Sequence, residues 1–139
     1  MGAVGRAAAL AVVVFLASAC GAGDDEPQST GPQTSVEVTL WPEGREGSRP
    51  ARVVLECEPT GGGHPRAEDA CAALAQEEGA LEPVPGDVAC TQIYGGPEEA
   101  RIAGVVGGRA VDAMFSRTNG CEIDRWDRLA PVFEVLALS

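Results

Sequence analysis

Cysteine is the residue of this chain with the most obvious chemistry, and there are five of them. Cys20 ends an apolar run near the start of the chain, whereas the other four lie in the remainder. These four are Cys57, Cys71, Cys90 and Cys121. Their spacings are too wide for the Cys-x-x-Cys motifs of zinc and redox sites, so we expect no metal and no cofactor. In an oxidising compartment they predict two disulfides, and the spacing leaves the pairing open.

The first twenty residues have the composition of an export leader. An apolar run follows the single basic residue Arg6 and ends in small residues, which is too short and wrongly flanked for a membrane-spanning helix. We predict a signal peptide over residues 1–19 and an extracellular protein. Two processing routes stay open, because a signal peptidase alone would cleave after Ala19, and lipid attachment to Cys20 would follow the same cleavage. The run Leu16 to Cys20 resembles a bacterial lipoprotein box, and a lipid would protect this unpaired thiol from oxidation.

Residues 20–35 form an acidic stretch rich in proline and glycine that cannot bury enough apolar surface to fold. We predict a flexible linker there, beginning with the lipidated Cys20, and one domain over residues 36–139 with a single modest core. The chain carries 21 acidic and 10 basic residues, a net charge of −11, and it contains no lysine. Nucleic acid is therefore a poor partner, and a membrane would be reached only through the lipid anchor.

The pattern of apolar residues predicts an α+β fold. Period-two alternation indicates strands, and a Gly107-Gly108 turn indicates that the two strands flanking it form a β-hairpin. The predicted strands are residues 36–40, 53–57, 101–106, 109–115 and 132–138. A helix is predicted to begin at His64-Pro65, where proline and acids suit a first turn, and to end before Gly79. A second short helix is predicted over residues 123–129, which gives about five strands and two helices.

Groups that could form an enzyme's catalytic site are scarce. Histidine is the usual general base near neutral pH, and the chain has one, His64, in a glycine-rich segment. That segment lacks a lysine and a strand-anchored glycine motif, so a structural turn is favoured over an anion site. The acidic pairs Glu77-Glu78 and Glu98-Glu99 are expected to be solvated rather than catalytic. We expect the chain not to be an enzyme.

The segment from Asp87 to Pro97 is the strongest candidate for a functional site. Apolar and β-prone residues adjoin Cys90 between prolines, which predicts an extended segment held rigid from one side. Here the sequence resembles the subtilisin-inhibitor-like family of actinomycete bacteria, over about Ala51 to Phe133. The matching motifs are Cys57-x-Pro59, His64-Pro65, Ala70-Cys71-Ala72-Ala73-Leu74, Asp87-Val88-Ala89-Cys90, Tyr94, Gly104-Val105, Gly108-Arg109, Phe115-Ser116 and Asn119-Gly120-Cys121-Glu122.

The resemblance implies a five-stranded antiparallel sheet covered by two helices, a homodimer, and the disulfides Cys57–Cys71 and Cys90–Cys121. It also implies an inhibitor whose loop enters a serine protease cleft as a substrate does, with the reactive bond between Gln92 and Ile93. The loop residues would be Ala89, Cys90, Thr91, Gln92, Ile93 and Tyr94. A neutral Gln92 in the primary specificity pocket points to proteases of the subtilisin type rather than the trypsin type.

Two departures from the family pattern affect this loop. Thr91 stands where proline is usual, and Gly95-Gly96-Pro97 replaces an acid followed by proline. A glycine that is not needed costs about 0.5 to 1 kcal/mol in chain freedom, so we expect the second half of the loop to be loose. Asn119 either supports the loop by hydrogen bonds or forms an Asn-Gly turn. The alternative function is a cell-surface lipoprotein of the same fold that has lost inhibition and serves as an interaction module.

Overall fold

The computed structural model describes residues 2, 31–134 and 136. The predicted signal peptide, Cys20 and most of the predicted linker lie outside these residues. Strand β1 begins at Thr34, two residues before the predicted start of the domain. The described elements are, in chain order, β1 (Thr34–Trp41), β2 (Ala51–Cys57), β3 (Gly61–Gly62), α1 (Ala67–Gln76), the short 3-10 helix η1 (Glu78–Leu81), β4 (Glu99–Val106), β5 (Arg109–Phe115), α2 (Gly120–Arg128) and α3 (Ala130–Phe133).

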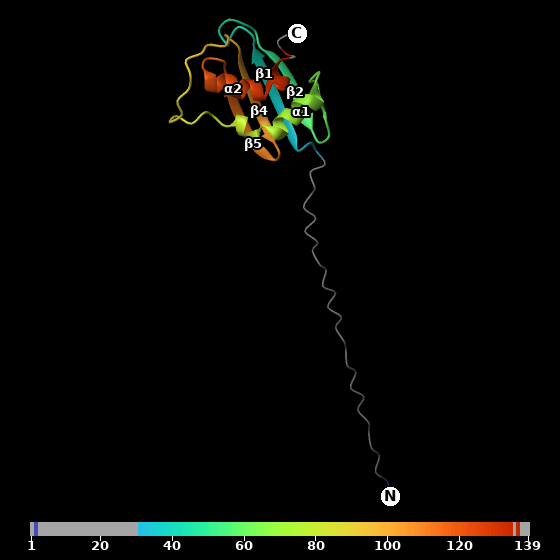
Figure 1. Cartoon of the computed structure of the whole chain (residues 1–139). Coiled ribbons are helices and arrows are strands. Elements are labelled where there is room, and N and C mark those ends of the chain that lie inside the picture. The colour runs from blue at the N-terminus through green and yellow to red at the C-terminus, as the bar shows by residue number, and fades with distance from the viewer. Residues whose placement is uncertain (1, 3–30, 135, 137–139) are drawn as a thin grey trace.

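The strands form one antiparallel sheet in the order β3-β2-β1-β4-β5, as Figure 1 shows for the longer strands. Val38 in the central strand β1 pairs with Val53 of β2 on one side and with Ile102 of β4 on the other. The predicted hairpin is confirmed as β4 and β5. Gly107 and Gly108 turn the chain with φ angles of 54° and 79°, the left-handed backbone that this tight turn requires. The predicted α+β class and antiparallel sheet are therefore confirmed.

The predicted last strand, over residues 132–138, is wrong where the structure describes it. Ala130–Phe133 form the short helix α3, and the adjacent residues Val132 and Phe133 are both buried. Two neighbouring buried side chains fit a helix, whereas a half-buried strand would expose one of them. Pro131 in the first turn also favours a helix start. The fifth strand is instead β3, which pairs Gly62 with Leu55 of β2.

Helices α1, α2 and α3 lie on one face of the sheet, and no described helix covers the other face (Figure 1). The core lies between these layers. Its aromatic centre is Phe133, whose ring centroid lies 5.1 Å from that of Phe115 and 4.6 Å from that of Trp126. Burying each phenylalanine contributes roughly 2 to 3 kcal/mol. Trp41, the last residue of β1, is only half-buried.

A disulfide and a histidine attach α1 to its neighbours. Cys57 at the end of β2 is bonded to Cys71 in α1, as predicted, across a loop of 14 residues that is worth about 3 kcal/mol. His64 is buried, and its Nδ1 accepts a hydrogen bond from the N–H of Arg66, so its Nε2 donates to the carbonyl of Val132 at 3.1 Å. The glycine-rich segment thus has a structural role, although it is a strand and a bend rather than the predicted turn, because Gly61–Gly62 form β3. Among the described residues, no helix has the length and apolar character needed to cross a membrane.

Candidate functional site

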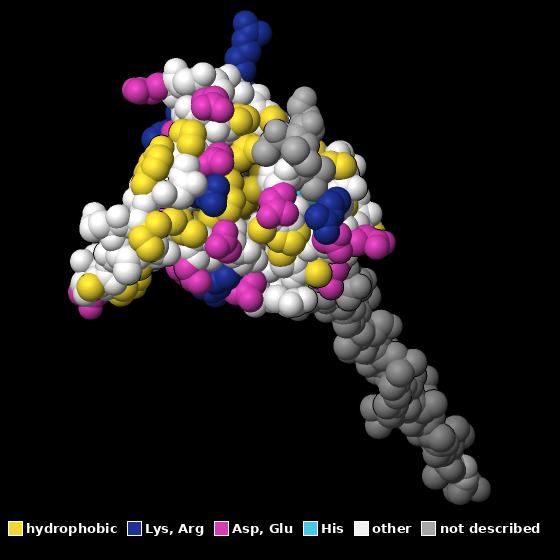
Figure 2. Space-filling model, turned by 45° about the horizontal axis from the view of Figure 1, so that its top comes forward, with side chains coloured by type: hydrophobic (Ala, Val, Ile, Leu, Met, Phe, Trp, Pro, Cys, Tyr) yellow, Lys and Arg dark blue, Asp and Glu magenta, His cyan; other side chains and the backbone are white. Residues whose placement is uncertain are grey.

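The predicted reactive loop is part of a long connection between η1 and β4 that has no regular secondary structure. It projects from the body of the molecule (Figure 1), and hydrophobic side chains lie along this projection at the left of Figure 2. Ile93 is 59% exposed and Tyr94 is 66% exposed, although both are apolar enough to prefer burial. Ala89, Thr91 and Gln92 are exposed as well. The loop therefore presents its side chains to solvent rather than to its own core, as surfaces that bind a partner do.

The disulfide Cys90–Cys121 fastens the loop to the start of α2. The two Cα atoms lie 5.4 Å apart, and the bond closes a loop of 31 residues, worth about 3 to 4 kcal/mol in the chain-entropy model. The pairing that the resemblance implied is confirmed. Cys90 is half-buried, whereas its neighbours Ala89 and Thr91 are exposed, so the loop is attached from one side and open on the other.

Backbone hydrogen bonds hold the loop on both sides of the predicted reactive bond. Before the bond, the carbonyl of Thr91 accepts from the N–H of Gly120 at 2.9 Å. After it, the N–H of Gly95 donates to the carbonyl of Arg117 at 2.7 Å. Both partners lie in the short segment 117–120, which ends at the first residue of α2. The peptide bond between positions 92 and 93 thus lies between two fixed points of the main chain.

The two glycines after the bond are required by their surroundings. A Cβ at position 95 would lie 2.9 Å from Cδ1 of Ile123 and 3.2 Å from Cβ of Arg117, so these neighbours would have to shift. Gly96 has a φ of 149° and no space for a Cβ beside the carboxylate of Glu98. The expectation that these glycines are unneeded is therefore wrong. They allow the loop to lie directly against α2.

Asn119 caps the first turn of α2. Its Oδ1 accepts a hydrogen bond of 3.0 Å from the N–H of Glu122, and its backbone is extended. An asparagine three residues before a glutamate is a known helix-start signal, and it explains why α2 begins at Gly120 rather than at the predicted residue 123. The described hydrogen bonds of the Asn119 side chain go to α2. Any support of the loop is thus indirect, through the helix start that carries Cys121.

Sequence reasoning missed two arginines near the loop. The Nη1 of Arg117 lies 3.2 Å from Oε1 of Glu98, and both side chains are mostly buried, so Glu98 is not the solvated acid that was expected. Arg125 is buried over the ring of Phe115, with its Nε donating to the carbonyl of Ala80 at 3.0 Å. Its ion pair with Glu122, at 2.8 Å, was the available signal, because acid and base are three residues apart on α2.

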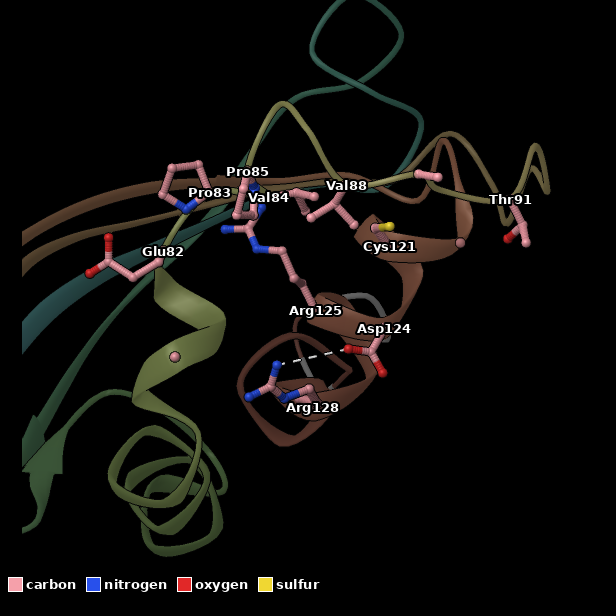
Figure 3. Close-up of a pocket in the computed structure, with 13 residues that line it drawn as sticks. Glu82, Pro83, Val84, Pro85, Val88, Thr91, Cys121, Asp124, Arg125 and Arg128 are labelled. Atoms are coloured by element: carbon pink, nitrogen blue, oxygen red, sulfur yellow. Dashed lines mark ion pairs between the residues drawn. The ribbon is translucent and has the colours of Figure 1, made fainter.

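An open cavity of about 440 Å³ lies beside the first half of the loop (Figure 3). Pro83, Val84, Pro85 and Val88 form one wall, and α2 forms the other. The polar groups of the α2 wall include Asp124 and Arg128, which pair at 3.8 Å, and the buried Arg125. The lining contains no histidine and no free cysteine. No cluster of potential metal ligands exists among the described residues.

Comparison with known proteins adds three findings. A family model described as subtilisin inhibitor-like matches residues 33–119. A Streptomyces cacaoi protein named subtilisin inhibitor-like protein 1 is 36% identical over 98 residues, which cover 66% of this chain and 88% of that protein. A crystal structure of Streptomyces caespitosus sermetstatin in complex with Bacillus licheniformis subtilisin matches with 23% identity and a TM-score of 0.47, covering 71% of this chain and 96% of that one. The family match includes the whole loop.

Proposed function

The chain belongs to the subtilisin inhibitor-like family, and on that premise we propose that it inhibits serine proteases of the subtilisin type through the bond between Gln92 and Ile93. The observation that carries the proposal is the exposed loop fixed on both sides of this bond. Thr91 and Gly95 are each tied to the 117–120 segment, and Cys90 is tied to α2. Such a loop loses little conformational entropy when it enters a protease cleft, which favours tight binding.

The side chains around the bond support a preference for subtilisin-like clefts. Gln92 is neutral, so it lacks the charge that trypsin-like pockets select. Ala89 and Thr91 are small and exposed on the side that precedes the bond. Under this proposal the chain is not an enzyme, because the peptide bond that the protease attacks lies in the chain itself.

A titration of subtilisin tests the proposal. We expect stoichiometric inhibition at micromolar protein, with slow cleavage between positions 92 and 93 seen by mass spectrometry. Gln92→Lys should add inhibition of trypsin without loss of folding, since it changes only an exposed side chain. Rapid cleavage at this bond without inhibition would instead support the alternative, an interaction module of the same fold.

We also infer a homodimer formed by the face of the sheet that the described helices leave uncovered. Val54, Val105 and Met114 are 44%, 39% and 38% exposed there, and Arg101 pairs with Asp112 among them. A two-fold dimer buries the same patch on both copies, and a mixed apolar and charged face suits such an interface. Sedimentation of the wild type and of Val105→Glu tests this, because the variant should be monomeric.

Extracellular export followed by lipid attachment at Cys20 completes the proposal. The two disulfides use four of the five cysteines, Cys57, Cys71, Cys90 and Cys121, and Cys20 is the fifth. A lipid there, with residues 20–35 as a linker, would keep the inhibitor at the outer face of the cell membrane. The mass of the mature N-terminus measures this directly. A free or absent Cys20 would make the protein a secreted one.

A further inference from the structure

The half of the loop that follows the reactive bond has no disulfide, and Arg117 contacts it at two points. The carbonyl of Arg117 accepts the hydrogen bond of the Gly95 N–H, at 2.7 Å. A Cβ added at Gly95 would lie 3.2 Å from the Cβ of the same arginine, so the two residues are in close contact. This contact is two residues away from Ile93, the residue that cleavage would turn into a new amino terminus.

Arg117 also holds the same stretch of chain at a second point. Its guanidinium Nη1 lies 3.2 Å from Oε1 of Glu98, three residues beyond Gly95, and the two side chains are 28% and 29% exposed. An ion pair shielded to this degree is screened by salt less than a surface pair. The backbone and the side chain of one residue thus fix the chain at positions 95 and 98.

The geometry of this ion pair suggests only a small contribution to the stability of the fold. Oε2 of Glu98 and Nε of Arg117 are buried and have no hydrogen-bond partner among the described residues. Unsatisfied buried polar atoms offset much of what such a pair contributes to folding. By contrast, the exposed pair of Arg101 and Asp112 is bidentate, at 2.7 and 2.6 Å. The Arg117 pair therefore matches a role in placing the loop better than a role in holding the fold.

We propose that Arg117 is a positioning residue that decides whether the cut loop is resealed or released; this inference rests on the proposed function. A serine protease forms an ester between its hydroxyl oxygen and the carbonyl carbon of Gln92, and the C–N bond to Ile93 breaks as its nitrogen takes a proton. Resealing is the reverse: the Ile93 amine attacks the ester, loses that proton, and the serine oxygen leaves and regains it. Arg117 keeps the amine within reach because Gly95 and Glu98 cannot move away.

Four variants test this role against subtilisin. Arg117→Met removes the charge but keeps the Cβ contact and the carbonyl, and Arg117→Lys restores a charge. Glu98→Gln removes the partner. The matched control is Arg66→Met, which breaks the exposed pair of Arg66 and Asp69 on another part of the surface. Inhibition constants, the equilibrium ratio of cut to intact chain, and melting temperatures are measured for each.

We expect Arg117→Met and Glu98→Gln to raise the inhibition constant and the cut-to-intact ratio about tenfold, with Arg117→Lys in between and the control unchanged. Melting temperatures should stay close to that of the wild type. Without any protease, the Gly95 amide should exchange its hydrogen about tenfold faster in Arg117→Met, while the Gly120 amide should not.

The outcomes separate this inference from the proposed function. A wild type that does not inhibit subtilisin removes both. If the wild type inhibits, and the Arg117→Met variant has the same inhibition constant and the same Gly95 amide exchange rate, the positioning role alone is overturned. A weakened variant in which the melting temperature falls and both amides exchange faster assigns Arg117 to stability, which also overturns the inference.

Discussion

The two disulfides of this domain lie in contrasting surroundings. Cys57–Cys71 joins β2 to α1, and Cys57 is buried at the edge of the hydrophobic core. Cys90–Cys121 joins the exposed loop to α2 and has solvent-exposed residues on both sides of Cys90. Both bonds restrict the unfolded chain by a similar amount, because loop-closure entropy grows slowly with loop length. The difference is in the folded state, where the first bond holds packed elements together and the second holds a segment that has no core of its own.

Removal of the loop disulfide should have the largest effect on function. In Cys90→Ala/Cys121→Ala the residues before the reactive bond keep one described backbone hydrogen bond to α2, that between Thr91 and Gly120. We expect the inhibition constant for subtilisin to rise at least about a hundredfold, which corresponds to about 2.7 kcal/mol of binding free energy. The free energy of unfolding should also fall by about 3 to 4 kcal/mol. Inhibition assays and urea unfolding at one temperature measure both, and unchanged inhibition by a folded variant would refute the role of this bond.

Removal of the other disulfide should separate stability from function. In Cys57→Ala/Cys71→Ala the free energy of unfolding should fall by about 3 kcal/mol, because a loop of 14 residues is released and a buried site loses volume. The inhibition constant should stay within about twofold of the wild type while the protein is folded, since the loop is attached elsewhere. Urea unfolding and a titration at 15 °C check the two values. Equal loss of inhibition in both double variants would show that the contrast between the bonds is wrong.

Gly95→Ala is expected to have a smaller effect, confined to the loop. The added methyl group would meet Ile123 and Arg117, so the second half of the loop must shift away from α2. Overpacking of this kind costs about 1 to 3 kcal/mol. We expect the inhibition constant to rise about tenfold. Ile123→Ala in the same chain should recover part of the loss, because it removes the atoms that the methyl group meets. The absence of any recovery would contradict this packing contact.

The sequence predicted most of the elements and, through the family resemblance, the disulfide of the loop, but not the other contacts that fix the loop. Alternation at positions 36–40 and the Gly107-Gly108 turn are local signals, and both were sufficient. The last strand was mispredicted because an apolar run such as residues 132–138 suits a strand or a helix, and only packing decides. The ion pair of Arg117 and Glu98 joins residues 19 positions apart, so no local sequence pattern predicts it. Gly95 appeared to be unneeded because its neighbour Ile123 comes from α2.

The smallest expected effect concerns the uncovered sheet face that carries the ion pair of Arg101 and Asp112. The hydrogen bond from Arg101 lowers the pKa of Asp112 below its ordinary value of about 3.8, and the same bond to Asp112 raises the pKa of Arg101. A carboxyl whose pKa is lower in the folded state than in the unfolded state stabilises the fold above the unfolded value. That contribution is lost as the pH falls through the folded value.

Asp112→Asn should therefore be slightly less stable than the wild type at pH 7, and this difference should shrink as the pH falls below about 3.8. The measurement uses a Val105→Glu background, which the dimer proposal expects to be monomeric, so that both groups are exposed to solvent. The difference therefore stays small and should weaken further in high salt. Urea unfolding at pH 7 and pH 2.5, at one protein concentration, measures it. Arg101→Gln should match Asp112→Asn at pH 7, since either change breaks the same pair. A stability difference that is equal at both pH values would assign the effect to the shape of the sheet face rather than to charge. Inhibition of subtilisin should be the same as for the wild type in both variants.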